Sequence, residues 1–93
     1  MDRKLLFLVN PISGTRTKEK LIAFITEKLN AAGISFAIDY TNATGNYTLL
    51  KEQVVAKRIT DIVIVGGDGS VNQVVQAFAS LPVRFGILPV GSG

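Results

Sequence analysis

The segment DIVIVGGDGSVNQVV, residues 61–75, combines a run of β-branched residues, a glycine-rich turn and the first part of an apolar repeat. At 61–65 isoleucine and valine follow the aspartate without polar alternation, and this pattern predicts a strand that is buried on both faces of a sheet. A strand that passes through a short turn into a helix is half of a parallel β–α–β unit. Beyond the turn, apolar residues recur at helical spacing, at Val71, Val74, Val75 and Phe78.

The same alternation of strands and helices extends along the whole sequence. Because the connections are short enough for right-handed crossovers, the predicted fold class is α/β, with an open parallel sheet of about four strands and helices on both faces. The strands at 4–9 and 61–65 are the most uniformly apolar, so we expect them at the centre of the strand order 2-1-3-4. The remaining strands are predicted at 34–40 and 85–89, and the helices at 17–33, 50–57 and 71–78.

Composition narrows the chemistry that these 93 residues can carry. The chain contains neither cysteine nor histidine, which excludes disulfides, thiolate metal sites and histidine-based acid–base catalysis, and which fits a reducing cytoplasm. The net charge of +3 comes from lysines interleaved with glutamates, and aromatic residues are sparse, so a nucleic-acid-binding surface is not expected. Neither a transmembrane segment nor a signal peptide is predicted, and the length suits one domain.

Four loops rich in small and polar residues follow the predicted strands at their carboxyl ends. In an open α/β sheet these ends meet at one edge, where ligands bind. Glycine lets backbone amides face an anion and helix N-termini carry partial positive charge, so we predict a phosphate-bearing ligand there. The loops match neither the dinucleotide fingerprint nor the Walker loop. They are NPISG at 10–14, TNATG at 41–45, GGDGS at 66–70 and PVGSG at 89–93.

Several residues of these loops also have a purely structural interpretation. Ser70 and Gln73 form the S-x-x-Q pattern of a capping box, and Asp68 is a further candidate for the helix cap. Asn10 precedes a proline, as turn residues often do, and Ser92 would cap a helix that followed it. Their occurrence together at one edge of the sheet favours the phosphate site.

Three motifs, VNPISG at 9–14, GGDGSVNQVV at 66–75 and LPVGSG at 88–93, resemble in this order the catalytic domain of diacylglycerol kinases. This family includes sphingosine, ceramide and bacterial lipid kinases. The resemblance covers nearly the whole chain and implies a fold like that of phosphofructokinases and NAD kinases. It implies ATP and Mg²⁺ as cofactors, and a lipid hydroxyl of diacylglycerol or sphingoid-base type at the membrane surface as phosphoryl acceptor.

The resemblance identifies residues 1–93 with the family's amino-terminal nucleotide-binding part. The second, β-rich domain of the family would then be absent, so we expect a truncated chain that is inactive by itself. We expect the complete enzyme in the cytoplasm, peripheral to the membrane while it acts on lipid. The acceptor lipid and the oligomeric state, a homodimer included, are not determined at this stage.

The resemblance also implies roles for individual residues. Asp68 is the implied catalytic residue, either beside the metal-bridged phosphates or as the base for the lipid hydroxyl, and no metal ligand is identified. The family's usual threonine and glutamate are replaced by Ser70 and Gln73, and TGNY at 44–47 departs from the family's usual residues. Nucleotide contacts are implied for Asn10, Ser13, Thr41, Gly66, Gly67, Asp68, Gly69 and Ser92.

Two other functions stay open. One is an NAD kinase-like small-molecule kinase, against which the motif VNPISG argues. The other is a catalytically inactive nucleotide-binding module, which is suggested by Gln73 in place of a glutamate.

Overall fold

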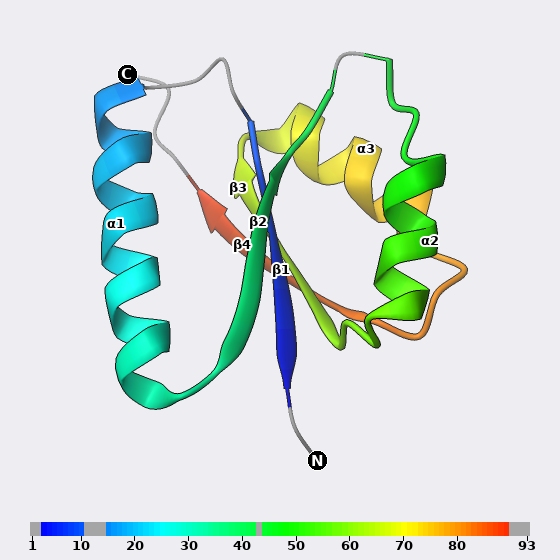
Figure 1. Cartoon of the computed structure of the whole chain (residues 1–93). Helices are drawn as coiled ribbons and strands as arrows, with labels where there is room; N and C mark the ends of the chain where they lie inside the picture. Colours follow the sequence, from blue (N-terminus) through cyan, green and yellow to red (C-terminus); the bar gives the residue numbers. More distant parts are fainter. Residues whose placement is uncertain (1–2, 11–14, 43, 90–93) are drawn as a thin grey trace.

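A four-stranded parallel sheet forms the centre of the computed structural model, which describes residues 3–10, 15–42 and 44–89. The strand order is β2-β1-β3-β4, and each strand pairs in parallel with its neighbour (Figure 1). The predicted fold class, strand order and central strands are confirmed. The strands are β1 (Lys4–Val9), β2 (Ser35–Tyr40), β3 (Asp61–Gly66) and β4 (Arg84–Pro89).

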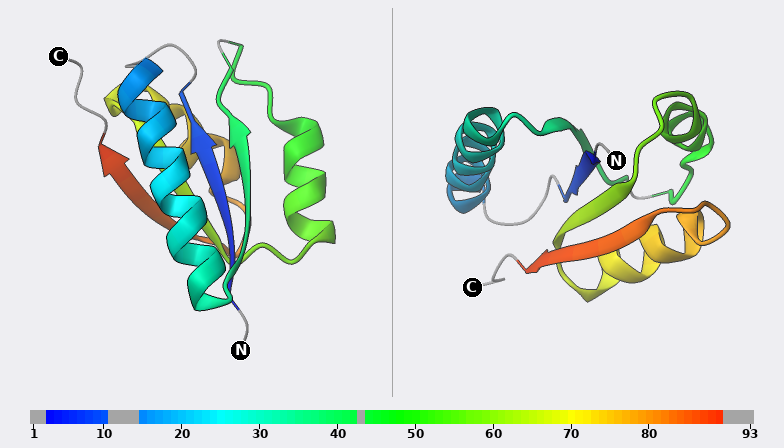
Figure 2. Two further views of the ribbon diagram at one scale, coloured as in Figure 1. Left: turned by 60° about the vertical axis from the view of Figure 1, so that its left-hand side comes forward. Right: turned by 90° about the horizontal axis from the view of Figure 1, so that it is seen from below.

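Helices cover both faces of the sheet, as predicted. α1 (Thr15–Ala32) lies on one face, whereas α2 (Thr48–Ala56) and α3 (Asp68–Phe78) lie on the other (Figure 1, Figure 2). Gly33 ends α1 with a φ of +71°, a backbone conformation that glycine adopts without strain. Because α1 and α3 leave the two central strands towards opposite faces, the carboxyl ends of β1 and β3 form the point where the chain changes direction across the sheet.

The sheet separates two hydrophobic clusters, which explains the continuous apolar runs of the central strands. In β1, Leu6 and Leu8 pack on the side of α2 and α3, together with Ile62 and Ile64 of β3. The alternate residues of β1 pack on the side of α1, in a second cluster that includes Leu5, Phe7, Val9, Ile25 and Val65. Each central strand is therefore buried on both faces and has no position for a polar side chain between its ends.

All three helices begin earlier in the sequence than their apolar repeats predict. α1 begins at Thr15 rather than at 17, α2 at Thr48 rather than at 50, and α3 at Asp68 rather than at 71. The first turns contain mostly polar residues, and an apolar repeat detects only the part of a helix that follows them. For α3 the difference affects the site, because Asp68, Gly69 and Ser70 lie in the helix and not in a loop.

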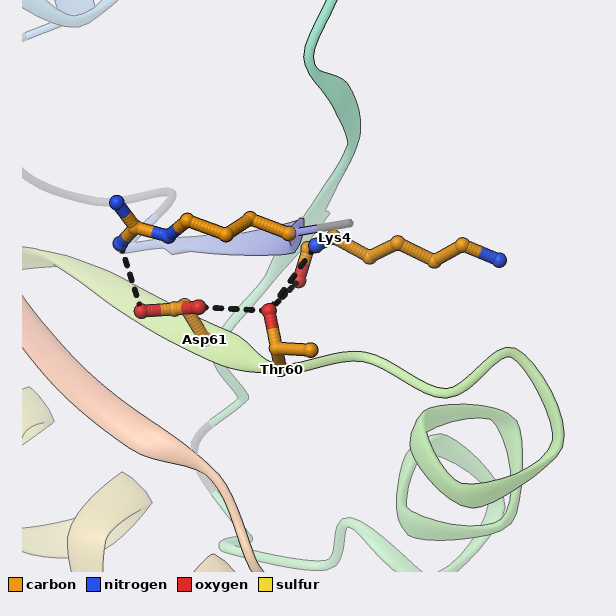
Figure 3. Close-up of polar contacts among 4 residues, drawn as sticks. Lys4, Thr60 and Asp61 are labelled. Carbon is orange, nitrogen blue, oxygen red and sulfur yellow. Dashed lines mark hydrogen bonds and ion pairs between the residues drawn. The ribbon is translucent and has the colours of Figure 1, made fainter. Parts of the chain in front are cut away.

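A polar network joins the amino-terminal ends of β1 and β3, at the edge of the sheet opposite to the predicted site (Figure 3). The buried Asp61 carboxylate accepts hydrogen bonds from Arg3 Nη2 at 2.9 Å and from the Thr60 hydroxyl at 2.6 Å. The Thr60 hydroxyl in turn accepts a hydrogen bond from the Lys4 N–H at 3.0 Å. The hydrogen bond from Arg3 lowers the pKa of Asp61, burial opposes this effect, and the bond from Thr60 adds to it. The network ties the two central strands together at their start.

Candidate active site

The carboxyl ends of β1 and β3 lie side by side and bring three of the predicted loops together. The Asn10 N–H donates to the Val65 carbonyl at 2.9 Å, and Asn10 Nδ2 donates to the Ser70 hydroxyl at 3.0 Å. Asn10 therefore links the loop after β1 to the first turn of α3. Next to it, the Thr41 N–H donates to the Val9 carbonyl at 3.0 Å, so that the end of β2 lies at the same edge.

Gly66 occupies the narrowest point of this edge. A Cβ atom at this position would lie 3.2 Å from the Cβ of Asn10 and 3.2 Å from the hydroxyl oxygen of Ser70. Such distances are tighter than most Cβ contacts, so a side chain here would force Asn10 or Ser70 to move by a few tenths of an ångström, and glycine avoids this crowding. The family resemblance implies a nucleotide contact for Gly66. The structure gives it a packing role that is independent of any ligand.

Gly67 and Gly69, in contrast, are not required by the packing. Both are exposed, and no described atom lies within 4 Å of a Cβ added to either of them. Gly67 has an extended backbone, with φ −98° and ψ −171°, which other residues adopt as well. The packing of the described residues therefore does not explain why either position is a glycine, and no described atom fills the space next to them.

The first turn of α3 presents backbone amides that point away from the helix. The first helical hydrogen bond runs from the Val71 N–H to the Gly67 carbonyl at 3.1 Å. The N–H groups of residues 68–70 precede this bond, and within the described ranges they have no acceptor, since no side chain caps the helix. Such amides, at the positive end of a helix dipole, form a binding site for anionic oxygens.

The capping box predicted for Ser70 and Gln73 is wrong. The helix begins at Asp68, so Ser70 is already helical, and its hydroxyl accepts the hydrogen bond from Asn10. Gln73 lies farther along the helix, where its Oε1 atom accepts a hydrogen bond from the Tyr47 hydroxyl at 2.7 Å. Asp68 is the first helical residue, and no side-chain cap is formed there, so a capping role of Asp68 is not observed either.

The segment after β2 begins at the same edge of the sheet and contacts α3 through Gln73. Thr41 is buried, with 7% of its surface exposed, and Asn42 binds Thr44, Gly45 and Asn46 by hydrogen bonds before α2 begins. An open groove of about 470 Å³ runs between this segment and α2. Periodicity and motif spacing did not predict the groove. Its lining includes Tyr40, Asn42, Asn46, Leu49 and Gln53.

The described residues thus bring Asn10, Thr41 and residues 66–69 to one edge of the sheet, as the sequence predicted. The predicted nucleotide contacts Ser13 and Ser92 lie outside the described residues.

The described residues contain no cluster of three or more carboxylate, histidine or cysteine side chains. Mg²⁺ in phosphoryl-transfer sites is often held by one or two carboxylates and by the substrate's own phosphates. Asp68 is exposed beside the open amides of α3 and fits one such ligand. Within the same ranges no helix is long and apolar enough to cross a bilayer.

Comparison with known proteins identifies the relatives of this chain. A family model described as the diacylglycerol kinase catalytic domain matches residues 4–93. A diacylglycerol kinase of Bacillus subtilis is 31% identical over 87 residues, and one of Staphylococcus carnosus is 26% identical over 94 residues, which covers 91% and 99% of this chain. The structure of a candidate diacylglycerol kinase of Bacillus anthracis matches 96% of the chain with a TM-score of 0.69 and 29% identity. The chain spans 29–31% of the length of these three relatives.

Proposed function

The chain belongs to the diacylglycerol kinase catalytic domain family, and on this premise we propose that it supplies the ATP-binding lobe of a lipid kinase. The kinase transfers the terminal phosphoryl group of ATP to the hydroxyl of a diacylglycerol or sphingoid-base lipid. The observation that carries the proposal is the uncapped start of α3, where the amides of residues 68–70 are open and the glycines at 67 and 69 are not needed for packing.

In this function the open amides bind the phosphates of ATP. Backbone N–H groups at a helix start are fixed before the ligand arrives, so they neutralise phosphate charge without reorganisation. Thr41 at the end of β2 and Asn10 at the end of β1 form the adjoining walls, and Ser13 and Ser92 complete the nucleotide contacts.

Asp68 would hold Mg²⁺ together with the phosphates of ATP. The metal supplies charge neutralisation for the transferring phosphoryl group. The Asp68 carboxylate lies at the amino end of α3, so it is placed beside the amides that bind the phosphates. The family resemblance implies that the base for the lipid hydroxyl and further metal ligands lie in a second domain. The proposal therefore implies that this chain is inactive without that domain.

A phosphorylation assay of the full-length protein tests the proposal. The protein is incubated with radiolabelled MgATP and, separately, with dispersed diacylglycerol, a sphingoid base and NAD. We expect label in one of the two lipids and none in NAD. Label in NAD alone would show an NAD kinase-like enzyme. MgATP binding without transfer to either lipid would show a nucleotide-binding module, and either result would refute the proposed function.

A further inference from the structure

Tyr47 connects the segment after β2 to α3 from a buried position. Its side chain is 4% exposed, and it lies directly before α2. Its ring packs against Phe78 at the end of α3, with 5.5 Å between the ring centroids and an interplanar angle of 46°. The ring therefore belongs to the hydrophobic core between α2 and α3.

The hydroxyl of Tyr47 makes two hydrogen bonds to groups outside the hydrophobic core. It accepts a bond from the Asn42 N–H at 3.2 Å, directly after Thr41 in the sequence. It donates a bond to Gln73 Oε1 at 2.7 Å, in the middle of α3. One buried oxygen atom thus joins the segment after β2 to the helix whose first turn carries the open amides.

The segment that Tyr47 holds is closed by its own hydrogen bonds. Asn42 Oδ1 accepts bonds from the Gly45 N–H at 2.7 Å and from the Thr44 hydroxyl at 2.9 Å, and Asn42 Nδ2 donates to the Asn46 carbonyl at 3.0 Å. Since its shape is set internally, the contact through Tyr47 positions the segment as a unit.

Gln73 also contacts this segment on a second side. Gly45 has a φ of +73°, and a Cβ atom there would lie 3.3 Å from Gln73 Nε2. The amide of Gln73 therefore covers the backbone of Gly45 while its oxygen binds Tyr47. A side chain at 45 would crowd the Gln73 amide and would be strained by the positive φ.

We propose that Tyr47 and Gln73 are positioning residues, which hold Thr41, Asn42 and residues 44–46 at a fixed place relative to the amides of residues 68–70. The inference rests on the proposed function. A nucleotide that contacts both the segment after β2 and the amides of residues 68–70 binds more tightly when the distance between them is fixed before binding. Less of the protein then has to be ordered on binding. A ligand that contacts only the amides gains nothing from this arrangement.

The test compares MgATP with inorganic tripolyphosphate as ligands of the full-length protein, by isothermal titration calorimetry. Tyr47→Phe keeps the ring packing and removes both hydrogen bonds of the hydroxyl. We expect it to weaken MgATP binding by about five- to thirtyfold, as for the loss of one or two neutral hydrogen bonds. Tripolyphosphate affinity should stay the same, since it uses the amides alone. A role in stability alone would lower both affinities together or neither.

Gln73 provides the matched variants. Gln73→Glu retains an acceptor oxygen for the Tyr47 hydroxyl and should keep the affinity for MgATP, whereas Gln73→Met should reproduce the loss seen in Tyr47→Phe. Combining Gln73→Met with Tyr47→Phe should add little, because both remove the same contact. The control is Gln76→Met on the exposed side of α3, where the side chain binds only Asn72 at 3.2 Å among the described residues.

Equal MgATP affinities of the wild-type protein and Tyr47→Phe, or an equal loss for both ligands, would overturn the inference and leave the proposed function intact. If the wild-type full-length protein binds neither ligand, the proposed function fails and the inference fails with it.

Discussion

Replacing Gly69 with alanine should make the protein more stable and its nucleotide binding weaker. Gly69 is a helical residue in the first turn of α3, and a Cβ atom added there meets no described atom within 4 Å. Alanine fits this conformation without strain and restricts the unfolded chain, which stabilises proteins by about 0.4–1 kcal/mol. For a domain of this size, that gain corresponds to a rise in melting temperature of about 2–8 °C.

The same methyl group would stand where the phosphates of ATP approach the amides of α3. Losing one hydrogen bond from an amide to a charged phosphate oxygen costs about 1.5–3 kcal/mol. This is a reduction in MgATP affinity of about 10- to 150-fold. Calorimetric unfolding measures the first effect, and isothermal titration with MgATP measures the second, on the same preparation.

Two other glycines serve as comparisons, because the structure gives each of them a role in packing or backbone conformation. Gly66→Ala places a Cβ atom 3.2 Å from Asn10 and Ser70, and such overpacking should lower the free energy of unfolding by about 1–3 kcal/mol. Gly33→Ala has open space but a φ of +71°, so backbone strain should cost about 1–2 kcal/mol and leave the affinity of the folded protein unchanged. If Gly69→Ala is stabilised and binds MgATP as the wild type does, the phosphates do not lie at the start of α3. A loss of stability would contradict the helical geometry of Gly69.

Three further predictions concern charged residues. Under the proposed function, Asp68→Asn in the full-length protein should lower lipid phosphorylation by about 100-fold for every acceptor, because charge neutralisation of the phosphoryl group is common to all of them, while the melting temperature stays unchanged. An unchanged turnover of Asp68→Asn would exclude a role at the phosphates. The pKa of Asp61 lies below its ordinary value of 3.8, so its carboxylate stabilises the folded state above pH 3.8 and this contribution is lost as the pH falls through the folded-state pKa. Asp61→Asn should therefore lower the free energy of unfolding at pH 7 by about 1–3 kcal/mol and flatten its decline below pH 3.8, which urea unfolding across pH measures. Arg58 is exposed with a φ of 56°, so Arg58→Gly should raise the free energy of unfolding by up to about 1 kcal/mol, and a decrease would show that this conformation carries no strain.

The fold follows from local patterns in the sequence. The apolar runs at 4–9 and 61–65 have no polar alternation, because both strands are covered on two faces, and this property alone places them at the centre of the sheet. The edge where the loops meet follows as well, since the carboxyl ends of parallel strands must lie together. Asn10, Thr41 and residues 66–69 could therefore be assigned to one edge from the order of strands and loops alone.

The tertiary contacts that distinguish the roles of these residues could not be predicted from the order of strands and loops. Gln73 fits a capping-box pattern, but its partner is Tyr47, 26 positions away, and the pairing exists only because α2 and α3 pack on the same face. Gly66 and Gly69 belong to one motif, yet the structure crowds the first against Asn10 and Ser70, whereas no described atom lies within 4 Å of a Cβ added to the second. Hydrophobic periodicity shows which side of a helix or strand is buried. It does not show which neighbouring element covers that side, because this depends on how the elements pack. In this protein the packing distinguishes the residues that contact one another at the carboxyl edge of the sheet from those that are open to a ligand.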